Sequence, residues 1–132
     1  MAGTFGYELD PGKLSEEEKQ CIREQIRQYK RYASLIGSGL YYRLSDPLTQ
    51  EAGAWEFVSE DGAEVLVSAV MLKVHGNMTV NYVRLKGLSG GCLYRERESG
   101  RIYGADALME TGVPLPVEMG EYHAYQMYFE RV

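Results

Sequence analysis

The side chains that most often carry catalysis are present, but they are not grouped in a recognisable pattern. His75 and His123 are the two histidines of this 132-residue chain, and Cys21 and Cys92 are its two cysteines. No HxH, HExxH or CxxC spacing occurs, so the sequence predicts no metal site, and nothing in it predicts a bound cofactor. Nucleophilic catalysis by a Cys92–His123 pair is an alternative that no neighbouring residue supports. Small, buried cysteines are the simpler interpretation.

Acidic residues and one glycine-rich segment are the other candidate sources of chemistry. Glu96 and Glu98 lie two positions apart, hence on one face of a predicted strand, as a pair of acid–base carboxylates would. Arginines alternate with them, so we expect a solvated, charged hairpin instead. Residues 88–92, Leu-Ser-Gly-Gly-Cys, lack the lysine of a phosphate-binding loop and the GxSxG spacing of a nucleophile elbow. We therefore expect a turn there and predict no catalytic residue in this chain.

Eleven tyrosines and one tryptophan offer a different chemistry, the stacking of aromatic rings on sugars. A row of exposed rings on one face of a sheet would suit a carbohydrate-binding module. The candidate rings are Tyr41, Tyr82, Tyr94, Tyr125, Tyr128 and Trp55. Tyrosine also fills the cores of β-sandwiches with its hydroxyl at a wet edge, and we favour packing over sugar binding.

One amphipathic helix is predicted over residues 16–35. Ser15 and Glu18 have the spacing of an N-terminal capping box, and Gly37 and Gly39 are expected to end the helix. Apolar residues at spacings of three and four form one stripe, made of Ile22, Ile26, Tyr29, Ala33 and Ile36. An uncovered stripe of this kind needs a partner, and in an independent interaction domain it would cause self-association.

The apolar period changes from about 3.6 to 2 after residue 39, which is typical of strands. Residues 60–62, Glu-Asp-Gly, predict a hairpin turn, and residues 75–77 predict another. The run from Val65 to Leu72 is apolar on both faces and predicts a central strand. The pattern as a whole predicts an all-β fold, an antiparallel β-sandwich of seven to eight strands of Greek-key type, preceded by the helix.

Charge and composition argue against several classes of function. Fourteen Lys plus Arg against nineteen Asp plus Glu give a net charge of −5, which argues against binding to nucleic acids or anionic membranes. No apolar run approaches the roughly 20 residues of a membrane-spanning helix, and the first residues lack the features of a signal peptide. Two cysteines make no disulfide framework, so we expect a cytoplasmic location.

Several segments, taken in order along nearly the whole chain, are similar to parts of one known family. The most specific are residues 3–10, Gly-Thr-Phe-Gly-Tyr-Glu-Leu-Asp, and residues 103–109, Tyr-Gly-Ala-Asp-Ala-Leu-Met. The others are residues 13–15, 41–44, 55–59, 85–88, 93–95 and 112–116. Together they resemble the C-terminal region of bacterial α-galactosidases of glycoside hydrolase family 36.

This resemblance implies a multidomain enzyme with an N-terminal β-domain, a central (β/α)₈ barrel and a C-terminal β-sandwich. Such an enzyme hydrolyses terminal α-galactosides, for example melibiose and raffinose, with retention and with two catalytic carboxylates. The family's Lys-x-Asp-x-Asn stretch, and the stretch ending near Arg-Phe-Asp, do not occur here, so no catalytic residue is carried over. The resemblance divides the chain into residues 1–37, similar to the end of the barrel with its last helix, and residues 38–132, the sandwich.

The chain would then be a non-catalytic fragment that braces the barrel of the same longer chain and contributes to oligomer contacts. Its apolar stripe would face that barrel, and galactosides would be handled only through the longer enzyme. Because barrel active sites lie at the C-terminal ends of the strands, Phe5 and Tyr7 are candidate substrate-binding residues. A carbohydrate-binding module and an independent protein-interaction domain are the alternative interpretations.

Overall fold

The computed structural model describes residues 5–76 and 79–132, which divide after Ser38 into two units. The first unit contains a short 3₁₀-helix, η1 (Pro11–Lys13), and helix α1 (Glu16–Ser38). The second contains β1 (Leu40–Arg43), β2 (Ala52–Val58), β3 (Glu64–Met71), β4 (Tyr82–Val83), β5 (Leu93–Glu96), β6 (Ile102–Gly104), α2 (Ala105–Glu110), β7 (Val113–Pro114) and β8 (Ala124–Arg131). The turn expected at residues 75–77 includes Asn77, which lies outside the described residues.

Helix α1 begins at the predicted residue 16, but it ends at Ser38, beyond the predicted end at residue 35. The Ser15 N–H donates to Glu18 Oε2 at 2.8 Å, and the Glu18 N–H donates to Ser15 Oγ at 3.2 Å, which is a complete capping box. Hydrogen bonds from the Ser15 backbone and side chain hold the pKa of Glu18 below its ordinary value. The helix runs through Gly37, because a glycine costs only about 1 kcal/mol in a helix. The Ser38 hydroxyl donates to the Ser34 carbonyl at 2.8 Å in the last turn.

Six strands form one antiparallel sheet in the order β1-β2-β3-β8-β5-β6. The predicted central strand is confirmed, since β3 pairs with β2 on one side and with β8 on the other. Its side chains are buried on both faces, as Val67 and Leu66 illustrate. On β2, Trp55 and Phe57 share one face, as the alternation of strand side chains requires.

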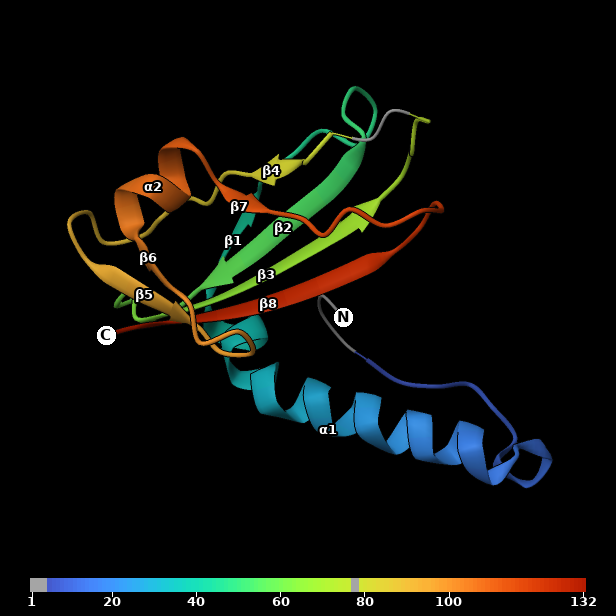
Figure 1. Ribbon diagram of the computed structural model, residues 1–132. Helices are drawn as coiled ribbons and strands as arrows, with labels where there is room; N and C mark the ends of the chain where they lie inside the picture. Colours follow the sequence, from blue (N-terminus) through green and yellow to red (C-terminus); the bar gives the residue numbers. More distant parts are fainter. Residues whose placement is uncertain (1–4, 77–78) are drawn as a thin grey trace. The chain divides into compact units, whose positions relative to one another are not determined.

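The second layer consists of the β4–β7 ribbon and α2, which lie over one face of the six-stranded sheet (Figure 1). Side chains from both layers form the core, with Val65, Val67 and Phe129 from the sheet meeting Leu85 and Leu108 from the second layer. The two layers confirm the predicted antiparallel β-sandwich, with eight strands in the described residues. Within those residues, no helix is both long enough and apolar enough to cross a bilayer.

The buried Tyr94 side chain forms hydrogen bonds with two separate segments of the sandwich. The Tyr94 hydroxyl donates to the Gly62 carbonyl at 2.6 Å and accepts the Ser89 N–H at 3.1 Å. Tyr94 lies on β5, Gly62 lies in the β2–β3 hairpin turn, and Ser89 belongs to the glycine-rich segment 88–92. The side chain therefore satisfies two backbone groups that would otherwise be desolvated without partners. This places the glycine-rich segment in a structural turn, as its sequence predicts.

Candidate functional site

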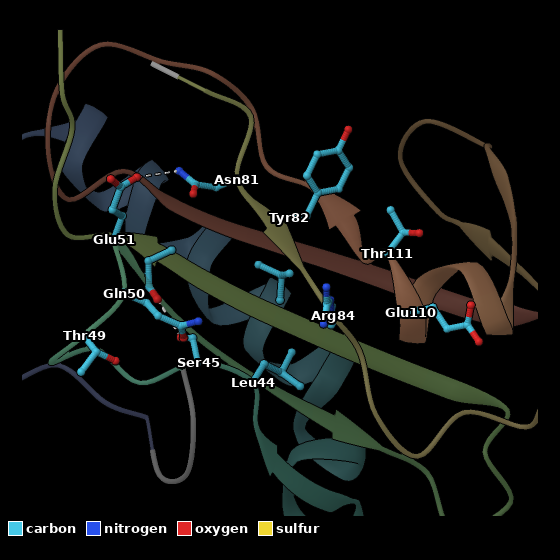
Figure 2. Close-up of a pocket in the computed structure, with 12 residues that line it drawn as sticks. Leu44, Ser45, Thr49, Gln50, Glu51, Asn81, Tyr82, Arg84, Glu110 and Thr111 are labelled. Atoms are coloured by element: carbon cyan, nitrogen blue, oxygen red, sulfur yellow. Dashed lines mark hydrogen bonds between the residues drawn. The ribbon is translucent and has the colours of Figure 1, made fainter. Parts of the chain in front are cut away.

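A polar groove opens on the surface of the second unit beside β4. Its volume is about 790 Å³. Figure 2 shows residues that line it. One wall comes from the segment between β1 and β2, and the other comes from residues 81–84 and the end of α2. The lining residues are Leu44, Ser45, Thr49, Gln50, Glu51, Ala52, Asn81, Tyr82, Val83, Arg84, Glu110 and Thr111.

Hydrogen bonds fix the wall between β1 and β2. The Ser45 hydroxyl donates to the Ala52 carbonyl at 2.7 Å and accepts the Ala54 N–H at 2.6 Å. The Asp46 N–H donates to Gln50 Oε1 at 2.8 Å. Across the groove, Asn81 Nδ2 donates to Glu51 Oε2 at 3.3 Å and joins the two walls. The groove is therefore preformed, which reduces the ordering cost of binding.

Other polar groups of the groove are not engaged in this way. In the part of the chain that the structure describes, the side chains of Arg84 and Glu110 make no hydrogen bond or ion pair. Tyr82 leaves 54% of its surface exposed. Figure 2 shows the Arg84 side chain between those of Gln50 and Glu110. These groups are available to a ligand.

The candidate tyrosine row is not present as a single surface. Tyr94 and Tyr128 are buried, and Tyr125 and Trp55 are half-buried, in line with the packing role that we favoured. Tyr41 is 54% exposed, as Tyr82 is, but it lies on β1 of the large sheet whereas Tyr82 lies on β4 of the ribbon.

The Cys92–His123 pair is the remaining catalytic candidate. The expected burial of the cysteines is wrong for Cys21, which is exposed, and Cys92 is half-buried. His123 Nδ1 lies 3.2 Å from Glu118 Oε2, and His123 Nε2 lies 3.0 Å from the Met119 carbonyl. Both ring nitrogens therefore have partners within five residues of His123, and neither contact involves Cys92. In residues 5–76 and 79–132, no group of three or more His, Cys, Asp or Glu side chains is placed to hold a metal ion.

The expected solvation of the Glu96–Glu98 hairpin is wrong for Glu96, which is only 7% exposed. Its carboxylate accepts the N–H groups of Glu98 at 2.9 Å and Ser99 at 2.7 Å, which closes the turn between β5 and β6. Burial alone would raise the pKa of Glu96, but the hydrogen bonds from Ser99 and Glu98 outweigh it and lower that pKa. Its role is structural.

Glu56 is the notable residue that sequence reasoning missed. It is fully buried on β2, where Oε1 accepts the Lys86 N–H at 2.7 Å and Oε2 finds no partner among the described residues. Burial raises the pKa of Glu56 to about 8, against the smaller opposing effects of the Lys86 N–H and charge. The missed signal is the alternation Ala52, Ala54, Glu56, Val58, which places this acid on the face that the small apolar residues share.

A second, apolar groove of about 570 Å³ lies within the first unit. Of the predicted stripe, Ile22, Ile26 and Tyr29 line it, whereas Ala33 is half-buried and Ile36 is buried outside it. Phe5 and Tyr7 also line it. The Phe5 ring centroid lies 5.2 Å from that of Tyr29 and 5.1 Å from that of Tyr7.

Fold and sites together define a β-sandwich domain that carries an amphipathic helix and open surface grooves. Residues 52–129 match the family described as the glycosyl hydrolase family 36 C-terminal domain. The chain therefore belongs to glycoside hydrolase family 36, and the resemblance seen in its sequence is confirmed.

Several relatives extend this match to nearly the whole chain. The bifunctional alpha-galactosidase/sucrose kinase AgaSK of Mediterraneibacter gnavus is 55% identical over 129 residues, which are 98% of this chain and 14% of that protein. The alpha-galactosidase AgaA of Geobacillus stearothermophilus is 42% identical over 122 residues, 92% of this chain and 17% of AgaA.

Solved structures also match nearly the whole chain to a small part of a longer protein. The galactosidase domain of AgaSK superposes with a TM-score of 0.92 at 52% identity, over 97% of this chain and 18% of that one. The crystal structure of AgaA superposes with a TM-score of 0.90 at 38% identity over the same shares. The chain thus spans less than a fifth of the length of these relatives.

Proposed function

We propose that this chain is the non-catalytic C-terminal domain of a retaining α-galactosidase and that it braces the catalytic barrel of the longer enzyme. The hydrolysis of terminal α-galactosides, such as melibiose and raffinose, belongs to that longer enzyme. The observation that carries this proposal is the match of 97–98% of the chain to only 14–18% of the AgaSK sequence and structure. Most of such an enzyme, including the family's two catalytic aspartates, would lie outside the segment matched here.

The apolar groove of the first unit supplies the bracing surface. Its aliphatic and aromatic lining, which includes Ile22, Ile26 and Tyr29, is the kind of surface that packs against another domain. In this proposal residues 1–37 form the end of the barrel, including its last helix, and residues 38–132 form the sandwich. The ring contacts of Phe5 with Tyr7 and Tyr29 support a packing role for residues 5–7 in preference to substrate contact.

An activity assay of the isolated chain tests the non-catalytic role. We expect the purified 132-residue chain to hydrolyse nitrophenyl α-galactoside no faster than buffer, since it lacks the family's catalytic stretches. AgaA of Geobacillus stearothermophilus, assayed in parallel, is the positive control. Hydrolysis that coelutes with the folded chain would contradict the proposal.

A further inference from the structure

We propose that the polar groove beside β4 binds a neutral oligosaccharide. The polar groove lies in the second unit and the apolar bracing surface in the first, so this binding function uses other residues than the proposed barrel contact. Its volume of about 790 Å³ lies within the range of small-molecule sites, roughly 300–1,000 Å³. That space accommodates a short saccharide along the groove.

The mixture of hydrogen-bonding groups matches sugar hydroxyls. A hydroxyl both donates and accepts, so it needs walls that offer both functions. The carboxylates of Glu51 and Glu110 accept, and the Arg84 guanidinium and the Gln50 amide nitrogen donate, while Gln50 Oε1 already accepts the Asp46 N–H. Planar carboxylate and guanidinium groups can each engage two neighbouring hydroxyls of one ring. Two contacts hold the Glu51 carboxylate in place: Oε2 accepts from Asn81 Nδ2 at 3.3 Å, and Oε1 lies 3.3 Å from His75 Nε2.

Charge disfavours an anionic occupant. Two carboxylates, of Glu51 and Glu110, and one guanidinium, of Arg84, line the groove, and the chain as a whole carries a net charge of −5. A phosphorylated sugar, a nucleotide or a nucleic acid would meet net repulsion there. A neutral polyol carries no charge for this field to repel, and it can donate to both carboxylates.

Tyr82 supplies the apolar contact that sugars require. Its ring stands at the rim of the groove, with its hydroxyl pointing away from the floor (Figure 2). One face of a pyranose ring presents C–H groups, which pack on an exposed aromatic ring with little loss of side-chain entropy, because tyrosine has only two side-chain torsions. Tyr41 has the same exposed fraction, 54%, but lies outside the groove, which makes it a matched control.

Amide chemical-shift titrations of the 132-residue chain test the site. The probes are raffinose and stachyose, with maltotriose as a neutral sugar that carries no galactose. We expect shifts concentrated at residues 49–52, 81–84 and 110–111. We also expect Tyr82→Ala and Arg84→Gln each to weaken the binding by about fivefold or more, with Tyr41→Ala unchanged. Thermal unfolding of each variant controls for folding, and all three substituted side chains are exposed.

Two results would overturn the proposal. One is the absence of shifts with all three sugars at concentrations up to tens of millimolar. The other is binding that survives Tyr82→Ala and Arg84→Gln but is lost in Tyr41→Ala, which would place the sugar on the large sheet. Neither result bears on the barrel-bracing role, which is measured by hydrolysis and depends on the first unit.

Discussion

Replacing Glu56 by glutamine should make the free energy of unfolding decrease less as the pH rises. Burial raises the pKa of this carboxyl from 4.5 to about 8, so the folded state keeps a proton that the unfolded state releases. A group of this kind stabilises the fold most below its unfolded pKa, and this contribution declines as the pH rises toward the folded value. We expect its share of the free energy of unfolding to fall by about 1.4 kcal/mol per pH unit between roughly pH 5 and pH 8.

Urea unfolding followed by the fluorescence of Trp55, the single tryptophan, measures this effect. Glu56→Gln keeps an acceptor for the Lys86 N–H and cannot ionise, so its stability should exceed that of the native chain by a few kcal/mol more at pH 9 than at pH 6. Parallel pH dependences in the two proteins would show that Glu56 is already ionised at neutral pH.

Glu96→Gln is the matched control, because Glu96 is also a buried strand glutamate but its pKa is lowered. Its carboxylate stabilises the fold above its unfolded pKa, and the contribution is lost as the pH falls through the folded value. Glu96→Gln should therefore reduce stability at neutral pH and approach the native chain only in acid. It should leave the slope between pH 6 and pH 9 unchanged.

Replacing Gly112 by alanine should destabilise the chain by about 3 kcal/mol or more. Gly112 has φ = 99°, a conformation that L side chains rarely adopt. A Cβ there would lie 2.6 Å from the Val83 carbonyl oxygen and 2.9 Å from the Arg84 nitrogen. These backbone atoms belong to β4 and the segment after it, which line the polar groove, so the substitution should also distort the groove.

Gly100→Ala separates the two causes of the lower stability expected for Gly112→Ala, which are the backbone strain and the steric contact with the β4 segment. Gly100 also has a positive φ, 68°, but a Cβ there would meet no atom within 4 Å. It should cost only the backbone strain, about 1–2 kcal/mol. Urea unfolding of both variants gives the comparison, and equal losses would show that the contact with β4 is not the dominant cost at Gly112.

Local signals in the sequence predict the framework of the fold well. Ser15 and Glu18 mark the start of α1, and the uninterrupted apolar run from Val65 predicts the central strand β3. Both features depend on neighbours in the chain or on strand periodicity, which the sequence displays directly. The end of α1 is less predictable, because Gly37 alone does not decide it.

The sites depend on contacts between distant segments, and sequence reasoning found them only in part. Glu56 accepts the N–H of Lys86, 30 residues away, and no local pattern indicates that partner. Tyr82 was singled out as an aromatic candidate, but its groove requires Gln50 and Glu110, which the sandwich brings to the same place. Of the stripe predicted on α1, Ile22, Ile26 and Tyr29 line the apolar groove, whereas Ala33 and Ile36 do not.

In the proposed function, this chain completes and supports the catalytic part of an α-galactosidase. The most direct measurement is the hydrolysis of nitrophenyl α-galactoside by the galactosidase domain of AgaSK, shortened to end before the segment that this chain matches. This chain, 55% identical to AgaSK over 129 residues, is supplied as a separate, coexpressed polypeptide.

We expect little activity from the shortened AgaSK alone and a clear recovery when the chain is present. Ile26→Glu places a charge in the apolar groove and should weaken the association by about 100-fold or more, whereas Gln20→Glu adds the same charge at an exposed position of α1 outside the groove and should preserve the recovery. Full activity of the shortened enzyme without the chain, or equal recovery with Ile26→Glu, would contradict the account.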